Sequence, residues 1–319
     1  MNASAVATTI FLAALQLAAF VAFAPFLTAT IRRTKAILQS RRGPGLLQPY
    51  RDLAKWWQKL PLESNVTGPV ARYAPAFVLG TVLTAALLVP LATVRTPLLS
   101  WGDLLVVVGL FAAARFALAL KALDSGSSFG GMGSSRDVAI SALAEPGLVL
   151  ALAGAAIAAG SSDLGAICGF GVSRGVGLLD PAHLLAAAAF AIVIVAETGH
   201  HPVDNPDTHL ELTMIHEGML LDASGRSLAM LVFASELKLA VLAAIFSAAF
   251  FPFGAATELA PGPIALGLIF GFVKMLVVGQ ALALLDASVA KARFLTMPDL
   301  IGLASLLALA GLGIQVLLP

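Results

Sequence analysis

Apolar segments of about 20 residues recur along the whole chain and constrain its fold more than any other feature. A helix needs about 20 apolar residues to cross the hydrocarbon layer of a bilayer. Eight segments meet this length: 6–30, 74–94, 103–122, 138–160, 181–198, 228–252, 262–285 and 299–318. The 319-residue chain is 12% charged, whereas soluble domains carry about 25% charged residues. The sequence therefore predicts an all-α, polytopic membrane protein with about eight transmembrane helices in a single integral-membrane domain, 1–319.

Basic residues are concentrated in alternate loops. The first predicted loop, 31–73, holds nine Lys or Arg residues and two acids. Basic residues also occur in or beside the loops 123–137, 199–227 and 286–298, whereas the even-numbered loops hold only Arg95 and Arg174. Cytoplasmic loops carry an excess of Lys and Arg. We therefore expect the odd-numbered loops in the cytoplasm and both termini on the other side.

The first loop contains a short amphipathic segment. Its apolar residues recur at i, i+4, i+7, i+11 and i+14, which places them on one helical face: Leu46, Tyr50, Leu53, Trp57 and Leu60. Charged and amide side chains occupy the rest of the segment. Two interpretations stay open, an interfacial helix that anchors the chain in the headgroup region and a docking surface for a cytoplasmic subunit.

Several ionisable residues fall within the predicted spans: Arg115, Glu145, Glu197, Glu236, Lys238 and Lys274. A charge at a lipid-facing helix centre costs about 2.5–3.5 kcal/mol on insertion scales. We therefore expect these side chains to face the bundle interior or a wet cavity. Pro146 follows Glu145 and favours a local kink, which makes this carboxylate a candidate proton carrier. The alternative is a static ion pair that fixes helix register.

The segment 196–222 gathers six of the 18 acids and four of the five histidines. Asn205, Pro206 and Asp207 are typical of a helix start, so we expect a helix from about 206 to 221. Its titratable groups have three interpretations: a metal site, a solvated acidic surface, or a proton relay facing a redox partner. Metal-ligand spacing is missing, and the segment adjoins the intramembrane Glu197. The relay candidates here are Asp204, Glu211, His216 and Glu217.

Cys168 is the only cysteine. Iron–sulfur clusters and [NiFe] centres need several cysteine ligands, so we expect no cofactor in this chain. Any redox chemistry then belongs to a partner subunit.

Three groups of motifs resemble the respiratory complex I membrane subunit 1 (NuoH) family. They are Ala196-Glu-Thr198 with Pro202-Val-Asp204, Pro206 and Glu211-Leu212; Arg42-Gly-Pro44 with Gly45-Leu-Leu-Gln-Pro49, Asp52 and Lys55; and Glu145-Pro146. The segments 209–217, 221–226 and 128–137 are more similar to the membrane-bound [NiFe]-hydrogenase branch. Hydrogenase-4 component C and formate hydrogenlyase subunit 4 belong to that branch.

The resemblance implies a non-catalytic subunit of the prokaryotic cytoplasmic (inner) membrane that seats a hydrophilic redox arm. That arm would contain subunits like the large and small subunits of hydrogenase, with Fe–S clusters and a [NiFe] centre. Antiporter-like membrane subunits would be further partners, translocating protons or Na⁺, and no nucleic acid is implied. The resemblance implies that Glu145, Glu197 and Glu211 are the buried acids of this family. It also implies that Arg42, Asp52 and Lys55 contact the docked arm, with Arg41 and Gln48 beside them.

Two departures from the family pattern disfavour a quinone site. The loop around 41–48 is shortened, and Ile31 stands where the family usually has a Glu. The alternatives that stay open are a quinone-site subunit of an NADH-type dehydrogenase, an independent ion transporter, and an inert anchor.

Overall fold

Eight long apolar helices form the protein. The computed structural model describes residues 3–62, 67–94, 102–204, 215–290, 292–293 and 296–317. Eight of its helices are long and apolar enough to cross a membrane. They are α1 (Ala3–Leu38), α3 (Pro69–Leu88), α4 (Leu104–Asp124), α5 (Ser128–Ala159), α7 (Pro181–Thr198), α9 (Gly225–Phe250), α10 (Pro261–Ser288) and α11 (Met297–Leu317). Each overlaps one predicted segment, and the described residues contain no strand, so the predicted fold class is confirmed.

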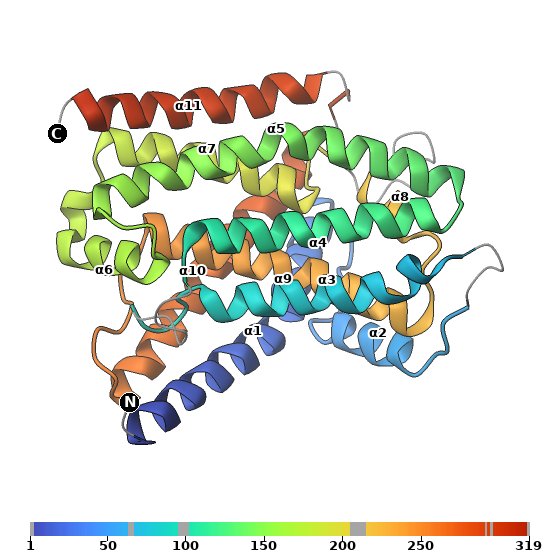
Figure 1. The fold of residues 1–319 in the computed structure, drawn as a ribbon, viewed down its shortest axis with the longest axis horizontal. Helices are drawn as coiled ribbons and strands as arrows, with labels where there is room; N and C mark the ends of the chain where they lie inside the picture. Colours follow the sequence, from blue (N-terminus) through green and yellow to red (C-terminus); the bar gives the residue numbers. More distant parts are fainter. Residues whose placement is uncertain are drawn as a thin grey trace.

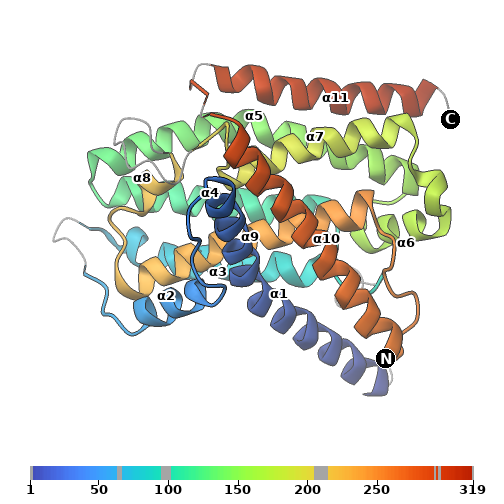
Figure 2. The same cartoon turned by 180° about the vertical axis from the view of Figure 1, so that it is seen from behind.

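The long helices form a bundle in which most axes run side by side (Figure 1). From behind, α1 and α10 cross the bundle obliquely and pack against each other (Figure 2). Small residues allow this close approach. A Cβ atom at Gly279 of α10 would lie 2.6 Å from a methyl group of Leu27 on α1. Both termini lie at one end of the bundle.

The shorter helices cover the two ends of the bundle (Figure 1). At the end away from the termini lie α2 (Gln48–Trp57) and α8 (His216–Leu220), and at the other end lies α6 (Leu164–Arg174), followed by a 3-10 turn. The amphipathic helix predicted in the first loop is α2. The sequence interpretation missed α6, although Asp163 is a recognisable N-cap that accepts a hydrogen bond from the amide of Ala166 at 2.8 Å.

Helix α1 is longer than its predicted span and continues from residue 30 to Leu38. No glycine or proline interrupts this stretch, and the helix ends just before Ser40, which has a left-handed φ of 56°. Arg32 and Lys35 therefore lie on a helix that reaches into the bundle, and not in a loop as predicted.

The segment after α7 is described only in part. Residues 205–214, which hold Glu211 and most of the helix predicted over 206–221, lie outside the described residues. The described remainder is α8, which lies directly against α5. A Cβ atom at Gly133 of α5 would come within 2.8 Å of the carbonyl oxygen of Ile215. This contact places the titratable groups of α8 beside the transmembrane helices.

Candidate functional site

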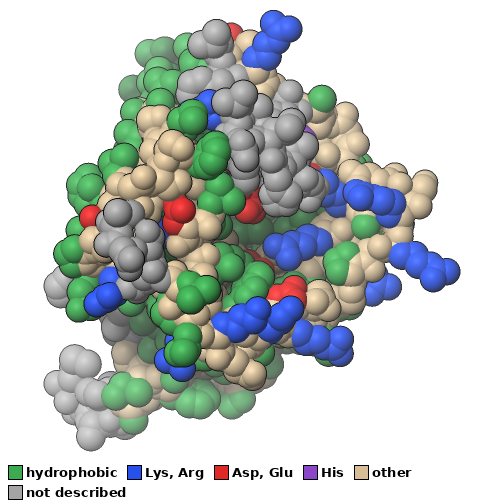
Figure 3. Space-filling model, turned by 90° about the vertical axis from the view of Figure 1, so that its right-hand side faces the viewer, with side chains coloured by type: hydrophobic (Ala, Val, Ile, Leu, Met, Phe, Trp, Pro, Cys, Tyr) green, Lys and Arg blue, Asp and Glu red, His purple; other side chains and the backbone are tan. Residues whose placement is uncertain are grey.

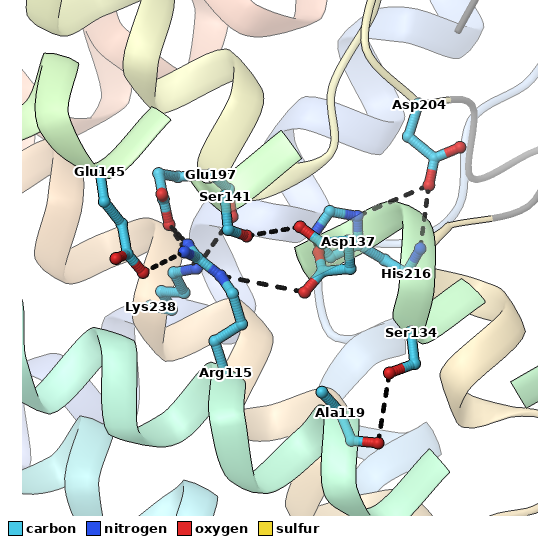
Figure 4. Close-up of polar contacts among 10 residues, drawn as sticks. All are labelled: Arg115, Ala119, Ser134, Asp137, Ser141, Glu145, Glu197, Asp204, His216 and Lys238. Atoms are coloured by element: carbon cyan, nitrogen blue, oxygen red, sulfur yellow. Dashed lines mark hydrogen bonds and ion pairs between the residues drawn. The ribbon is translucent and has the colours of Figure 1, made fainter. Parts of the chain in front are cut away.

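Three transmembrane helices, α4, α5 and α7, bring charged side chains together at the guanidinium group of Arg115, near the middle of α4 (Figure 4). Its Nη1 donates to Glu145 Oε1 of α5 at 2.6 Å, and its Nη2 pairs with Glu197 Oε2 of α7. Its Nε lies 3.9 Å from Asp137 Oδ2, also on α5. Arg115 thus stands between three carboxylates, with 9% of its side chain exposed.

Glu197 is the most deeply buried acid of this group, with 1% of its side chain exposed. Lys238 of α9 contacts the same carboxylate oxygen as Arg115, with Nζ 2.8 Å from Oε2 and 3.0 Å from the backbone carbonyl oxygen of Glu197. The second carboxylate oxygen, Oε1, has no hydrogen-bond partner among the described residues. A buried acceptor left in this state is destabilising by roughly 1–3 kcal/mol, so a hydrogen-bond donor placed at Oε1 would lower the energy.

His216 extends the network towards α8. Its Nε2 lies 3.3 Å from Asp137 Oδ1 and its Nδ1 lies 3.5 Å from Asp204 Oδ2. Its backbone amide also donates to Asp204 Oδ2 at 3.1 Å. Gly199, with φ of 65°, leaves room for the ring, because a Cβ atom there would lie 2.8 Å from Nδ1. The imidazole therefore bridges two carboxylates.

We call this set the charge cluster: Arg115, Asp137, Glu145, Glu197, Asp204, His216 and Lys238. It contains four carboxylates and three basic side chains. In Figure 4 it extends from Glu145 at one side to Asp204 at the other. The contacts are continuous, so a change of charge at one member alters the energy of the others.

Burial alone would lower the pKa of His216, but the carboxylates of Asp137 and Asp204 outweigh burial and raise its pKa above the ordinary value. Because the folded-state pKa is raised, the protonated ring stabilises the fold fully below about pH 6.5, the ordinary value for His. This stabilisation is lost as the pH rises through the raised folded-state pKa.

We therefore predict that wild-type protein loses thermal stability relative to His216→Gln as the pH rises above 6.5. The measurement is the unfolding temperature of both purified proteins across that range. Parallel pH curves for the two proteins would contradict the assignment of a protonated ring.

A second network joins α1, α10 and the segment after α7 at Asp286. Its Oδ2 lies 2.8 Å from His200 Nδ1 and 3.9 Å from Lys35 Nζ, and its Oδ1 accepts from the amide of His201 at 2.9 Å. Asp286 and Lys35 are both buried. This network fixes the segment after α7 to two transmembrane helices.

A cavity of about 330 Å³ connects the two networks. Arg115, Glu197 and Lys238 of the charge cluster line it, and so do Lys35 and Asp286 of the second network. Apolar side chains from α1, α3, α4 and α9 form much of the remaining wall. Figure 3 views the molecule from the end that carries α2 and α8, where the surface is hollowed and Lys and Arg side chains gather beside the hollow.

Not every residue proposed from the sequence joins the cluster. Glu236 is buried and lines the same cavity, and its Oε2 has no hydrogen-bond partner among the described residues. Glu217 also lines the cavity. Lys274 lies elsewhere, with its Nζ donating to the carbonyl oxygen of Phe251 at 3.0 Å, just past the end of α9. Glu211 lies outside the described residues.

The residues proposed for docking lie on or beside α2. Arg41, Arg42 and Lys55 are exposed, and the amide of Gln48 donates to Asp52 Oδ1 at 2.9 Å. Helix α2 packs against α1 and α9. Trp57, on the apolar face of α2, is 52% exposed. Helix α2 thus presents both basic and apolar groups outside the bundle.

Sequence reasoning missed three members of these networks as site residues: Lys35, Asp137 and Asp286. A signal existed for Asp137, since Asp137, Ser141 and Glu145 are spaced by four residues and share a helical face. Asp286 is a single acid at the end of an apolar span. Among the described residues, no group of three or more His, Cys, Asp or Glu side chains is arranged to hold a metal ion.

Comparison with known proteins supports the family that the sequence motifs resemble. The chain matches the family described as NADH dehydrogenase over residues 10–317. It is 35% identical over 276 residues to formate hydrogenlyase subunit 4 of Escherichia coli, covering 85% of this chain and 87% of that protein. It is 34% identical over 287 residues to hydrogenase-4 component C of the same organism, covering 90% of each.

The similarity to the oxidoreductase branch is lower. The chain is 30% identical over 253 residues to an NADH-quinone oxidoreductase subunit of Cereibacter sphaeroides, covering 74% of this chain and 75% of that protein. A chain of the membrane-bound sulfane sulfur reductase, an archaeal respiratory membrane complex, has the same fold, with a TM-score of 0.85 at 21% identity. That likeness covers 96% of this chain and 99% of the other. The protein therefore belongs to the NADH dehydrogenase family of membrane proteins.

Proposed function

We propose that this chain is the membrane anchor and coupling subunit of a complex-I-like redox complex of the membrane-bound hydrogenase or formate hydrogenlyase kind. Partner subunits carry the Fe–S clusters and the [NiFe] centre, and this chain carries the ionisable groups that respond to them. The charge cluster is the observation that carries the proposal, because it runs from α8, at one end of the bundle, to the middle of the transmembrane helices. The similarity to formate hydrogenlyase subunit 4 and hydrogenase-4 component C supports the choice of complex.

The end that carries α2 and α8 is the docking end for the redox arm in this proposal, and it faces the cytoplasm. Its exposed basic residues agree with the positive-inside rule. The chain that follows α2 is held firmly on α9: Arg226 Nε donates to the carbonyl oxygen of Trp57 at 3.1 Å. A Cβ atom at Gly225 would lie 2.6 Å from the carbonyl oxygen of Leu60. In this proposal, α2 and the chain that follows it form a fixed surface for the docked subunit. A shift of that subunit is then passed to α9 through these contacts.

Coupling in this proposal is electrostatic. At an effective dielectric constant of about 20, a new charge about 8 Å from a carboxylate changes its energy by about 2 kcal/mol. That is more than a tenfold change in a protonation equilibrium. Electron transfer in the docked arm would therefore alter proton occupancy near Asp204 and His216. The contacts through Asp137 and Arg115 then carry the change to Glu197 and Glu145.

Infrared difference spectroscopy of the intact complex tests this proposal. We predict that reducing the arm changes the carbonyl band of a protonated carboxyl group, and that the change is lost in Glu197→Gln. Glu258→Gln is the matched control, because Glu258 is exposed between α9 and α10. A spectrum in which wild type and Glu197→Gln show the same carboxyl change would refute the assigned relay.

The cavity favours a second candidate function, binding of a quinone. Its volume of about 330 Å³ lies in the range of small-molecule sites, which combine apolar walls with a few polar groups. In this candidate a quinone-site inhibitor protects the purified complex from thermal unfolding, and replacing the cavity-lining Ala234 by Phe removes the protection. Absence of protection in the wild type would exclude the quinone candidate and leave the first proposal standing.

A further inference from the structure

The short helix α8 is held in place by a buried lysine of α4. Lys121 is 3% exposed, and its Nζ donates to the carbonyl oxygen of Met219 at 2.9 Å. Met219 lies in α8 and has no exposed surface. The hydroxyl oxygen of Ser125, the C-cap of α4, lies 3.1 Å from Asp222 Oδ2, just past the end of α8. Two polar side chains at the end of α4 thus hold the C-terminal end of α8.

The ammonium group of Lys121 is used on the backbone of α8. Burying a charged group is costly unless the group is paired and hydrogen-bonded. Among the described residues Lys121 forms no ion pair, and the carbonyl oxygen of Met219 is its hydrogen-bond acceptor. Lysine side chains commonly bond the last carbonyls of a helix in this way. An apolar side chain would fill the same space but could not make this bond.

Helix α5 contacts α8 closely at its other end. A Cβ atom at Gly133 of α5 would lie 2.8 Å from the carbonyl oxygen of Ile215 and 3.3 Å from the amide nitrogen of Met219. Ile215, which precedes α8, is 2% exposed. Helix α8 is therefore held between a lysine of α4 and a glycine of α5, and both contacts are with its backbone.

These contacts set the position of His216, the first residue of α8. Its ring lies 3.3 Å from Asp137 and 3.5 Å from Asp204. Lys121 and Arg115 lie on the same helix, six residues and therefore about 9 Å apart along its axis. One helix thus carries both the guanidinium group at the centre of the charge cluster and the group that holds α8. A displacement of α8 would separate His216 from the rest of the cluster.

We propose that Lys121 is a positioning residue for the charge cluster, which fixes α8 so that the ring of His216 stays between Asp137 and Asp204. It acts through the backbone of α8 and carries no proton itself. The inference rests on the proposed function, because it concerns the same relay. It adds the residue that holds the relay together at α8.

The pH dependence of stability reports the position of His216. The charged groups that act on its ring are Asp137 of α5, Asp204 of the segment after α7, and Lys238 of α9. The two carboxylates raise the pKa of His216, and Lys238 lowers it. A ring that leaves the carboxylates therefore loses the raised pKa, and with it the stabilisation that protonation supplies to the fold at low pH.

Lys121→Met removes the ammonium group and keeps an unbranched side chain. We expect its unfolding temperature to follow the same pH dependence as that of His216→Gln, whereas wild type keeps its additional loss of stability above pH 6.5, the ordinary pKa of His. In a His216→Gln background, Lys121→Met should lower the unfolding temperature equally at every pH, because the two residues act as one unit. A wild-type pH dependence in Lys121→Met would overturn the proposal.

Lys274→Met is the matched control for this change. Lys274 also donates to one backbone carbonyl, that of Phe251 at 3.0 Å, but it lies apart from the charge cluster. We expect Lys274→Met to lower the unfolding temperature without changing its pH dependence. The same change of pH dependence in both variants would show that the loss of either lysine suffices, and the positioning role of Lys121 would be wrong.

A second variant displaces α8 from the other side and leaves Lys121 intact. Gly133→Ala places a methyl group against the carbonyl oxygen of Ile215, so we expect it to lose the same pH dependence. Gly131→Ala is its control, because a Cβ atom there meets no atom within 4 Å. Wild-type pH dependence in Gly133→Ala would overturn the proposal. These readouts need no redox partner, so their failure would remove only the role of Lys121, whereas an unchanged infrared response in Glu197→Gln would remove the proposed function.

Discussion

Arg115→Ala is expected to destabilise the protein by about 3–5 kcal/mol and to prevent a stable complex from forming. Among the described residues, the guanidinium group is the contact that Glu145, Glu197 and Asp137 share. Removing one partner of a buried ion pair leaves an uncompensated charge, which is far more destabilising than the pair itself is stabilising. Lys238 and His216 together cannot balance the four carboxylates of the cluster that remain. The measurement is the unfolding temperature of the purified protein together with the yield of assembled complex.

Arg174→Ala is the matched control for this change. Arg174 is exposed on α6 and contacts Phe170 by a cation–π interaction, so its loss is expected to change stability by about 0.5 kcal/mol or less. Arg115→Lys should remain impaired, because an ammonium group cannot reproduce the geometry with which guanidinium bridges carboxylates. Wild-type stability of Arg115→Ala would show that the carboxylates are already neutral or solvated.

The number of membrane-spanning helices was predictable because the bilayer itself fixes their length and polarity. Each apolar segment had to form a helix to satisfy its own backbone hydrogen bonds, and no knowledge of its neighbours was needed. Helix α6 was not predicted because it is too short to span the bilayer. The bilayer therefore does not fix its length or polarity. The ends of α1 and α5 were misjudged for a related reason, since polar residues beyond the hydrocarbon layer can continue a helix without any change in hydropathy.

From the sequence, the candidate site was predictable only as a set of ionisable residues inside apolar segments. Glu145, Glu197 and Lys238 stood out because each would be costly in lipid. Their pairing depends on which helices are neighbours, and the sequence contains no local signal for that. Asp137 was passed over as a loop residue because the predicted span began after it. Lys274, although equally conspicuous in the sequence, lies on α10 against the end of α9 and apart from the cluster.

The second network shows the same limit. Asp286 lies at the end of α10, and the groups that meet it come from α1 and from the segment after α7. The metal-site interpretation of the segment 196–222 included its histidines, whereas the ring of His200 is paired with the carboxylate of Asp286 in the structure. Long-range contacts of this kind become visible only when the bundle is assembled.

Glu197→Gln is expected to abolish coupled ion transport while electron transfer in the redox arm continues. Glutamine keeps the size of the side chain and one acceptor oxygen, but it carries no charge and cannot gain or release a proton. Glu197 lies between Arg115 and Lys238, at the point where the cluster enters the transmembrane helices. The measurement is the number of protons moved per electron transferred, in sealed vesicles that contain the assembled complex.

This ratio tests the central claim most directly, because it separates coupling from turnover and from assembly. The account predicts a normal ratio in the wild type and in Glu258→Gln, whose side chain is exposed away from the cluster. It predicts a ratio near zero in Glu197→Gln with the arm still bound and active. A wild-type ratio in an assembled Glu197→Gln complex would contradict the account, because coupling would then run by a route that does not use the charge cluster.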